Sequence, residues 1–195
     1  VQTCALPIYP VRIVLLGSTG IVGQQTLEIV RQFPSMCRVT GLAAATNRDR
    51  LRDQINEFKP RAIAFPYEID GQTNVSLEEL ATRSDADLVV VATTGRAGLE
   101  ATLAAIAAKK RVAIANKEIM VMAGRHIVEA AQRSGAPIFP VDTALSSVAQ
   151  CLEQGAPGIA DIVFTTTGGP FWWRSPAEVQ VVSREEVVRQ ASGAM

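Results

Sequence analysis

The sequence predicts an α/β fold: a Rossmann-type doubly wound parallel sheet, followed by the start of a truncated α+β catalytic domain. Apolar, β-branched segments alternate along the chain with amphipathic segments of helical length. This alternation produces parallel strands that are connected by helices. A glycine-rich loop joins the first predicted strand to the first predicted helix. Polar side chains follow several later strands, at the edge where open α/β sheets bind ligands.

Short β-branched runs predict the strands, and one-sided apolar spacing predicts the helices. The first run, VRIVLL, ends at Gly17 and is typical of a buried strand. Pro34 ends the first helix, and Ser76 with Glu79 has the spacing of a capping box. The predicted strands are Val11–Leu16, Arg38–Ala44, Arg61–Phe65, Asp87–Thr93, Arg111–Asn116, Pro137–Val141 and Asp161–Thr165. The predicted helices are Ile21–Phe33, Arg48–Phe58, one beginning at Ser76, Leu99–Lys109, Lys117–Ser134 and Ser146–Gln154.

Composition and charge exclude several classes of protein. The 195 residues include 19 basic and 19 acidic side chains, which argues against a partner such as nucleic acid held by bulk charge. The apolar runs Ile13–Leu16 and Leu88–Ala92 are far shorter than the roughly 20 residues of a membrane-spanning helix, so no membrane partner is expected. The 3 cysteines form no CxxC pair, which favours a reducing, cytoplasmic location. The single histidine excludes sites built from several histidines.

The loop Gly17-Ser-Thr-Gly20-Ile-Val-Gly23 has the position of a dinucleotide-binding loop. A phosphate must approach the backbone N–H groups closely, and a side chain at Gly17 or Gly20 would block it. Gly23 allows the helix to pack tightly on the strand. The alternative is a tight turn that binds no ligand, but the location between a strand and a helix favours binding.

The end of the second predicted strand indicates which dinucleotide is bound. Proteins that bind NAD usually carry an acidic residue there, for the ribose 2′-hydroxyl. This chain has Thr46, Asn47 and Arg48 instead, which suit a 2′-phosphate and predict NADPH. In the alternative interpretation, Arg48 and Arg50 are only solvated residues in the first turn of the next helix.

Polar residues that follow the later strands are candidates for the rest of the site. Asn116, Lys117 and Glu118 follow one strand, and Asp142 and Thr143 follow the next. We expect them to converge at the carboxyl edge of the sheet. Each taken alone is open to a structural interpretation, because Asn116 and Asp142 could simply cap the helices that follow them.

The chain divides into three parts on composition. Gly155, Pro157 and Gly158 cluster after the last predicted helix, which places a boundary near residue 150. We expect an NADPH-binding domain over 11–150 and the start of a catalytic domain over 151–195. Residues 1–10 begin with VQTCALPI, which resembles the translation of a common sequencing adapter and lacks the charged region of a signal peptide. We therefore expect a non-native leader there.

Several stretches together resemble the 1-deoxy-D-xylulose 5-phosphate reductoisomerase family. They are LLGSTGIVGQQTLEIVRQFP (15–34), AGLEATLAAIAAKKRVAIANKE (97–118), VMAG (121–124), PVD (140–142), QCL (150–152) and GGPF (168–171). Their order and spacing match over residues 11–190. The resemblance implies an NADPH-dependent enzyme, requiring Mg²⁺ or Mn²⁺, that rearranges and reduces 1-deoxy-D-xylulose 5-phosphate to 2-C-methyl-D-erythritol 4-phosphate. It also implies a role in non-mevalonate isoprenoid biosynthesis, a homodimer, and a complete chain about twice as long.

The resemblance assigns roles to individual residues. For the cofactor, the matching positions are Gly17, Thr19, Gly20, Ile21, Val22, Ala45, Thr46, Asn47, Asn116 and Glu118. For the substrate, they are Lys117, Thr143 and Thr167. Lys117 and Asp142 are the catalytic candidates, and Asp142 matches a metal carboxylate.

One position departs from the family motif Asp-Ser-Glu-His. This chain has Asp142, Thr143, Ala144 and Leu145 there, so alanine replaces a metal-binding glutamate. We therefore expect this chain alone to be inactive and to hold no measurable Mg²⁺ or Mn²⁺. Two alternatives stay open: another Rossmann oxidoreductase, of the semialdehyde or homoserine dehydrogenase type, and a non-catalytic nucleotide-binding remnant, which Ala144 favours.

Overall fold

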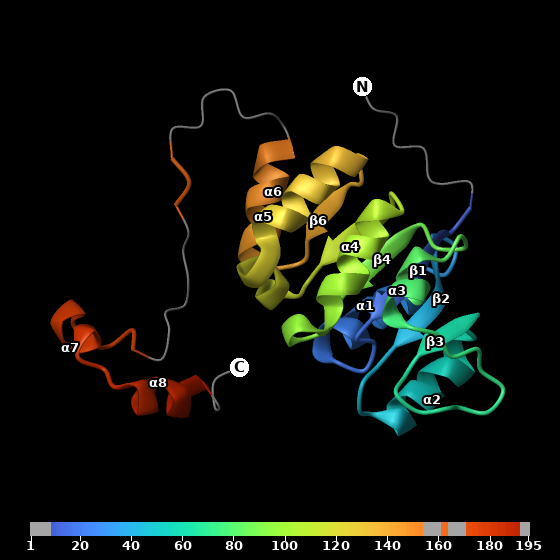
Figure 1. The fold of residues 1–195 in the computed structure, drawn as a ribbon, viewed down its shortest axis with the longest axis horizontal. Coiled ribbons are helices and arrows are strands. Elements are labelled where there is room, and N and C mark those ends of the chain that lie inside the picture. Colours follow the sequence, from blue (N-terminus) through green and yellow to red (C-terminus); the bar gives the residue numbers. More distant parts are fainter. Residues whose placement is uncertain (1–8, 154–160, 164–170, 192–195) are drawn as a thin grey trace. The chain divides into compact units, whose positions relative to one another are not determined.

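The computed structural model of the chain describes residues 9–153, 161–163 and 171–191 (Figure 1). The chain forms two compact units, one ending at Cys151 and the other beginning at Leu152. The first unit contains the whole sheet. The assignment of these parts to a cofactor-binding and a catalytic domain stays a prediction.

The first unit is built on a 6-stranded parallel sheet. Its strands are β1 (Val11–Leu16), β2 (Cys37–Ala43), β3 (Ala62–Ala64), β4 (Leu88–Val91), β5 (Arg111–Ile114) and β6 (Ile138–Pro140). The strands are arranged in the order β3-β2-β1-β4-β5-β6, which is that of a doubly wound nucleotide-binding fold. The predicted fold class of this unit is therefore confirmed. The order reverses between β1 and β4, and ligands of such sheets bind beyond the carboxyl ends of the strands at that point.

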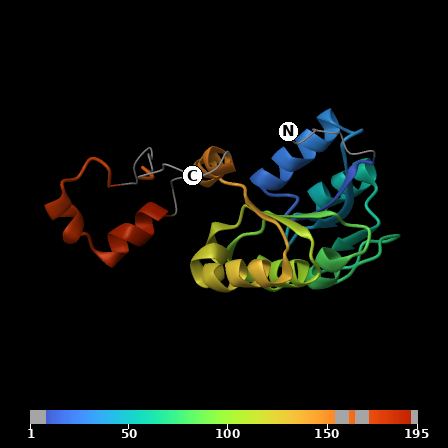
Figure 2. The ribbon, with the colours of Figure 1, turned by 90° about the horizontal axis from the view of Figure 1, so that it is seen from above.

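Helices cover both faces of the sheet (Figure 2). In the first unit they are α1 (Ile21–Gln32), α2 (Arg48–Phe58), α3 (Leu77–Thr82), α4 (Leu99–Ala107), α5 (Lys117–Ser134) and most of α6 (Thr143–Glu153), with a short 3₁₀ turn at Gly95–Gly98. Leu27 of α1 and Leu51 of α2 share a buried cluster with Leu15. A second buried cluster, around Leu16, takes side chains from α3, α4 and α5. Successive residues of a strand face opposite sides, so β1 supplies both clusters.

Most predicted elements occur near their predicted bounds, and β1, α2 and α5 have the bounds that were predicted. Two predictions were wrong. The last helix of the first unit begins at Thr143 rather than at Ser146, because the Asp142 carboxylate accepts N–H groups of its first turn. Asp161–Val163 form no strand, and residues 164 and 165 of that prediction lie outside the described residues.

The second unit contains α7 (Pro176–Gln180) and α8 (Arg184–Ala191). Ser175 and Glu178 form a capping box at the start of α7. The Arg174 guanidinium lies 5.1 Å from the ring centroid of Phe171 and 4.9 Å from that of Trp173, and it also pairs with Glu186. In the part of the chain that the structure describes, no helix is both long and apolar enough to cross a membrane.

Candidate functional site

Two glycines of the loop are required by the backbone around them. Gly17 has a φ of 91°, and a Cβ atom there would lie 2.4 Å from the carbonyl oxygen of Ala92. A Cβ atom on Gly23 would lie 2.3 Å from the carbonyl oxygen of Gly17. Neither position accommodates a side chain, because backbone atoms cannot move aside cheaply. These glycines therefore bring the loop into contact with the end of β4 and with α1.

Gly20 is different, because the protein around it leaves room for a side chain. A Cβ atom there would lie 3.5 Å from the Gly17 oxygen, which is an ordinary contact. Gly20 is the N-cap of α1 and offers no side chain to bond its first N–H groups. Uncapped N–H groups and the partial positive charge of a helix N-terminus form a binding site for phosphate. The surrounding protein therefore does not require glycine at position 20, whereas a phosphate bound at the helix N-terminus would require it.

A cleft of about 240 Å³, which we call the glycine-loop cleft, opens beside this loop. Its walls come from the loop, from the end of β2 and from the segment that follows β4. Among the predicted cofactor residues, Gly17, Thr19, Gly20, Ala45 and Thr46 line it. The structure adds residues that the sequence analysis did not assign to the cofactor, notably Ala92, Thr93 and Thr94.

Helix α2 ties the second-strand tip to the glycine loop. The Asn47 side chain accepts the N–H of Arg50 and caps α2. The Arg50 guanidinium donates to the carbonyl oxygen of Thr19 at 3.2 Å. Arg48 donates to the carbonyl oxygen of Glu68 at 3.0 Å. Both arginines are exposed at the surface but hydrogen-bonded to the backbone, so they are not merely solvated.

Gln54 is a second link between α2 and the loop, and the sequence analysis missed it. Its side-chain nitrogen donates to the carbonyl oxygen of Ser18 at 2.9 Å, and both residues are buried. The signal was a polar residue between Leu51 and Ile55 on the apolar face of α2. A buried polar side chain at such a position normally has a specific hydrogen-bonding partner.

The Asn116 side chain is buried and hydrogen-bonded to neighbouring segments of the protein. It is only 2% exposed, its side-chain oxygen accepts the N–H of Ile119, and its amide donates to Thr93 and to the carbonyl oxygen of Gly95. Asn116 therefore caps α5 and fixes the segment after β4 that forms one wall of the glycine-loop cleft. Glu118 lies exposed in the first turn of α5.

Lys117 and Asp142 form an ion pair at the neighbouring strand ends. The Lys117 ammonium lies 2.5 Å from one carboxylate oxygen of Asp142. This contact, together with N–H donation from Leu145 and Ala144, lowers the pKa of Asp142. Both residues line a hollow of about 430 Å³ together with Thr143 and Val22, which we call the Lys117–Asp142 hollow. The structure thus brings four predicted site residues together, whereas Thr167 lies outside the described residues.

The residues of this hollow do not by themselves fit a hard divalent cation. One oxygen of Asp142 already accepts two N–H groups, and the other pairs with Lys117. Ala144 supplies no ligand atom in its side chain. Across residues 9–153, 161–163 and 171–191, no three His, Cys, Asp or Glu side chains come close enough to hold a metal ion. Mg²⁺ and Mn²⁺ bind stably through several oxygen ligands.

Comparison with protein families and curated proteins gives one consistent match. The family model for 1-deoxy-D-xylulose 5-phosphate reductoisomerase matches residues 13–76 and 67–124. The reductoisomerase of Shouchella clausii is 38% identical over 94% of this chain, and that of Pelotomaculum thermopropionicum is 41% identical over 82%. These alignments cover 52% and 46% of the two relatives. The chain thus spans about half the length of the curated relatives that it matches.

Solved structures of 1-deoxy-D-xylulose 5-phosphate reductoisomerases have the same fold as this chain. The Zymomonas mobilis reductoisomerase in complex with NADPH is 32% identical, with a TM-score of 0.79 over 92% of this chain and 52% of that one. A reductoisomerase in complex with NADPH, fosmidomycin and magnesium is 30% identical, with a TM-score of 0.71 over 95% of this chain and 52% of that one. A homoserine dehydrogenase from Thiobacillus denitrificans, at 24% identity and a TM-score of 0.53, shares the fold alone.

Proposed function

This chain belongs to the 1-deoxy-D-xylulose 5-phosphate reductoisomerase family, and we propose that the protein containing it converts 1-deoxy-D-xylulose 5-phosphate to 2-C-methyl-D-erythritol 4-phosphate with NADPH. The observation that carries the proposal is the glycine-loop cleft. It combines an uncapped helix N-terminus with a second-strand tip that lacks an acidic residue. The NADPH complex of the Zymomonas mobilis relative supports the same cofactor.

The residues of this chain bind and orient the reactants. The first N–H groups of α1 suit the pyrophosphate of the cofactor, and Thr46, Asn47 and Arg48 suit its 2′-phosphate. Arg50, whose guanidinium lies against the glycine loop, is a further cation for the 2′-phosphate. Bound NADPH supplies the hydride that reduces the rearranged sugar phosphate. Lys117 presents an ammonium, 70% exposed, that can hold a substrate oxygen, and Thr143 lies beside it with its hydroxyl. Asn116 holds one wall of the cleft in place.

A metal requirement depends on residues that the described part of this chain does not supply. A reductoisomerase relative has been solved with magnesium. Here, Asp142 is the carboxylate at the matching position, and its oxygens already have partners. A divalent cation in the complete protein would therefore need ligands beyond those that the described residues bring to Asp142. We also propose a cytoplasmic homodimer, from the cysteine usage and the family resemblance.

A second function is favoured by one specific observation. Ala144 removes a metal ligand of the family motif, which favours a protein that binds NADPH without catalysing the reaction. The two functions differ in turnover but not in cofactor binding. A different Rossmann oxidoreductase is the weaker alternative, because its structural likeness extends to the fold alone.

The test is titration calorimetry of the chain with NADPH and with NADH. We expect tighter binding of NADPH, and we expect Gly20→Val to abolish binding of both, because its side chain fills the phosphate position. Equal affinities for the two cofactors would overturn the assignment of the second-strand tip. Unchanged binding in Gly20→Val would show that the loop is only a turn.

A matched pair of arginine variants tests the 2′-phosphate assignment. Arg50→Ala removes the guanidinium that lies against the glycine loop, and Arg52→Ala removes an exposed one from the same helix. We expect the first change alone to reduce the preference for NADPH. Turnover of 1-deoxy-D-xylulose 5-phosphate by the complete protein then separates an enzyme from a nucleotide-binding remnant.

A further inference from the structure

A cavity of about 850 Å³ lies at the edge of the sheet opposite the glycine-loop cleft. It is formed where β1, β2 and β5 begin and where the chain enters β4. At about 3.3 Å per residue, the length of β1 separates this edge from the glycine loop by roughly 20 Å. We call it the amino-edge cavity.

The charged side chains that line this cavity are strongly unbalanced. They comprise the cations Arg12, Arg38, Lys109, Lys110 and Arg111, and a single carboxylate, that of Asp87. The register of the sheet brings them together. Arg12 and Arg38 are direct partners on neighbouring strands, and the backbone of Asp87 bonds to those of Arg12 and Arg111. Like charges gathered around one space repel one another, and an anion bound among them would relieve that repulsion.

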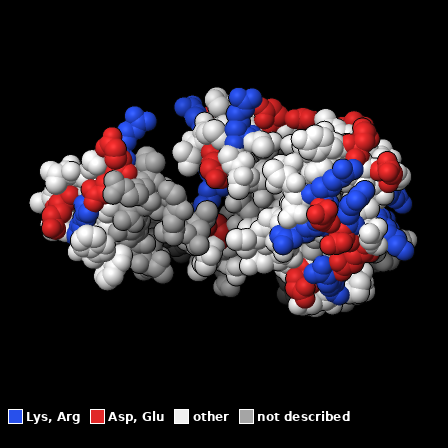
Figure 3. Space-filling model, turned by 90° about the horizontal axis from the view of Figure 1, so that it is seen from below, with Lys and Arg blue, Asp and Glu red and all other residues white. Residues whose placement is uncertain are grey.

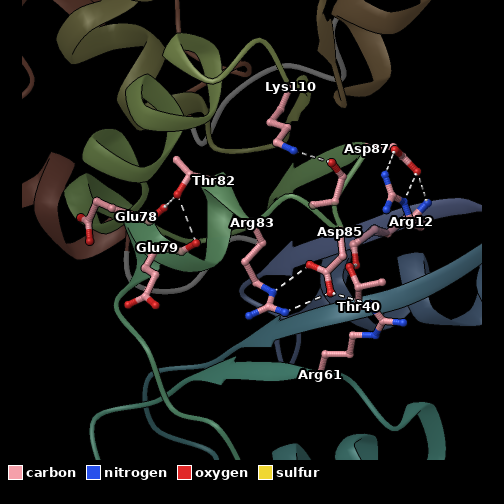
Figure 4. A network of polar contacts seen from close by, with 12 residues as sticks. Arg12, Thr40, Arg61, Glu78, Glu79, Thr82, Arg83, Asp85, Asp87 and Lys110 are labelled. Atoms are coloured by element: carbon pink, nitrogen blue, oxygen red, sulfur yellow. Dashed lines mark hydrogen bonds and ion pairs between the residues drawn. The ribbon is translucent and has the colours of Figure 1, made fainter.

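The one carboxylate is already fully engaged (Figure 4). Arg12 donates to Asp87 through Nε at 2.9 Å, through Nη2 at 2.6 Å and through its backbone N–H at 2.9 Å. The side-chain hydrogen bond from Arg12 is the main cause that lowers the pKa of Asp87 to about 2. Asp87 therefore stays ionised and neutralises Arg12. The charge of Arg111 also contributes to the lowered pKa of Asp87, but the carboxylate forms an ion pair only with Arg12 among the cations of the cavity.

The Lys110 ammonium also has a partner within the protein, because it donates to the carbonyl oxygen of Ala86 at 2.7 Å (Figure 4). Arg38, Lys109 and Arg111 remain, and none of them forms an ion pair with any carboxylate in the described residues. The negative end of the α4 dipole can offset part of the charge on Lys109. It offers nothing to Arg38, which lies on β2.

Lys109 occupies a backbone conformation that disfavours it. Its φ is 56°, in the left-handed region where glycine is the usual residue after a helix. A lysine at this turn adds a cation to the cavity at a cost in backbone strain. The turn itself needs only the backbone, whose N–H groups bond to Ala105 and Ile106 of α4.

We propose that the amino-edge cavity binds a small phosphate-type oxyanion, at a site separate from the cofactor cleft. Arg38 and Arg111 present planar guanidinium groups, which pair with phosphate oxygens through two hydrogen bonds each. The volume exceeds that of a single phosphate, so pyrophosphate is the probe that uses the three unpaired cations together. An extended polyanion such as nucleic acid fits less well, because the chain carries 19 basic and 19 acidic residues. Figure 3 shows one face of the molecule, on which acidic and basic side chains are interspersed.

The experiment is a calorimetric titration of the chain with inorganic pyrophosphate, with orthophosphate and a nucleoside triphosphate as further arms. It is run with and without saturating NADPH, which would occupy the other phosphate-binding position. We expect binding of pyrophosphate that persists with NADPH present and weakens as salt is added. Loss of binding in NADPH would place the anion in the glycine-loop cleft and overturn the proposal. So would the absence of binding at millimolar concentrations.

Two variants and a control locate the site. Arg38→Glu should weaken pyrophosphate binding at least tenfold. Lys109→Gly should weaken it several-fold while the melting temperature stays equal or rises, because glycine relieves the positive φ. Arg52→Glu reverses an exposed charge on α2 and should change nothing. Wild-type affinity in both cavity variants would refute the proposal, and it would do so whether or not the chain binds NADPH.

Discussion

Two hollows lie at the carboxyl edge of the same sheet, and they differ in how much of their wall this chain supplies. The glycine-loop cleft is bounded by a loop that two glycines hold against backbone atoms. Arg50 and Gln54 of α2 support this loop through hydrogen bonds to its carbonyl oxygens. The Lys117–Asp142 hollow has one ion pair and one helix N-terminus, with Ala144 where the family has a carboxylate. The walls of the first hollow are thus fixed by contacts within this unit, whereas the proposed reaction centre at the second hollow would need further residues beside Asp142.

The substitution that should disturb the glycine-loop cleft most is Gly17→Ala. The added Cβ would overlap the Ala92 carbonyl, and the positive φ would be strained. We expect a loss of about 3 kcal/mol in the free energy of unfolding. Gly20→Ala is the matched control, because its Cβ meets only an ordinary contact. Urea denaturation of both variants gives the answer, and equal stabilities would show that the two glycines have the same role.

The substitution Ala144→Glu tests whether the Lys117–Asp142 hollow lacks a metal ligand. A second carboxylate near Asp142 should raise the affinity for Mn²⁺ at least tenfold, or about 1.4 kcal/mol. The same change in the complete protein should raise the rate of NADPH oxidation with 1-deoxy-D-xylulose 5-phosphate. Ala144→Gln is the control, with the same length and no charge. Tight Mn²⁺ binding by the unmodified chain would mean that the ligands lie elsewhere.

The link between α2 and the glycine loop predicts a smaller effect for Gln54→Leu. This change leaves the buried carbonyl oxygen of Ser18 without its donor. We expect a loss of about 1 kcal/mol in stability and a several-fold weaker affinity for NADPH. Arg52→Leu, an exposed change on the same helix, serves as the control. Thermal melts and NADPH titrations measure the two quantities, and wild-type behaviour would exclude Gln54 as a support of the loop.

The smallest expected effect concerns the pH dependence of the Lys117–Asp142 pair. The pKa of Asp142 is lowered in the folded chain. The ionised carboxylate therefore contributes its full stabilisation at pH values above its ordinary pKa of 3.8. That contribution is lost as the pH falls through the lower, folded-state pKa. Asp142→Asn keeps the helix cap but loses the charge, and should cost about 0.5 kcal/mol near neutral pH, because Lys117 is largely exposed. Urea titrations across pH should show the difference disappearing in acid; a constant gap would contradict it.

In the first unit, the sequence predicted the strands, the helices and the position of the glycine loop, because these features depend on neighbouring residues. In the second unit it did not predict α7, and the strand that it placed at Asp161–Thr165 does not form at Asp161–Val163. Periodicity and β-branched runs placed β1, α2 and α5, and the spacing of Gly17, Gly20 and Gly23 located the loop. The sequence analysis was less successful where a capping side chain determines the residue at which a helix begins. The start of α6 moved to Thr143 because Asp142 bonds to its first turn, a contact that apolar spacing does not register.

The fold class and the residue types at the carboxyl edge of the sheet could be read from the amino-acid order alone. Which of those residues contact one another became known from the packed structure. Arg50 and Gln54 contact a loop more than 30 residues away, and Lys117 of α5 pairs with Asp142, which lies between β6 and α6. The row of charges through Arg12 and Asp87 depends on strand register. The physical reason is that such contacts join elements distant in the chain, and their geometry is set by how the sheet and its helices pack.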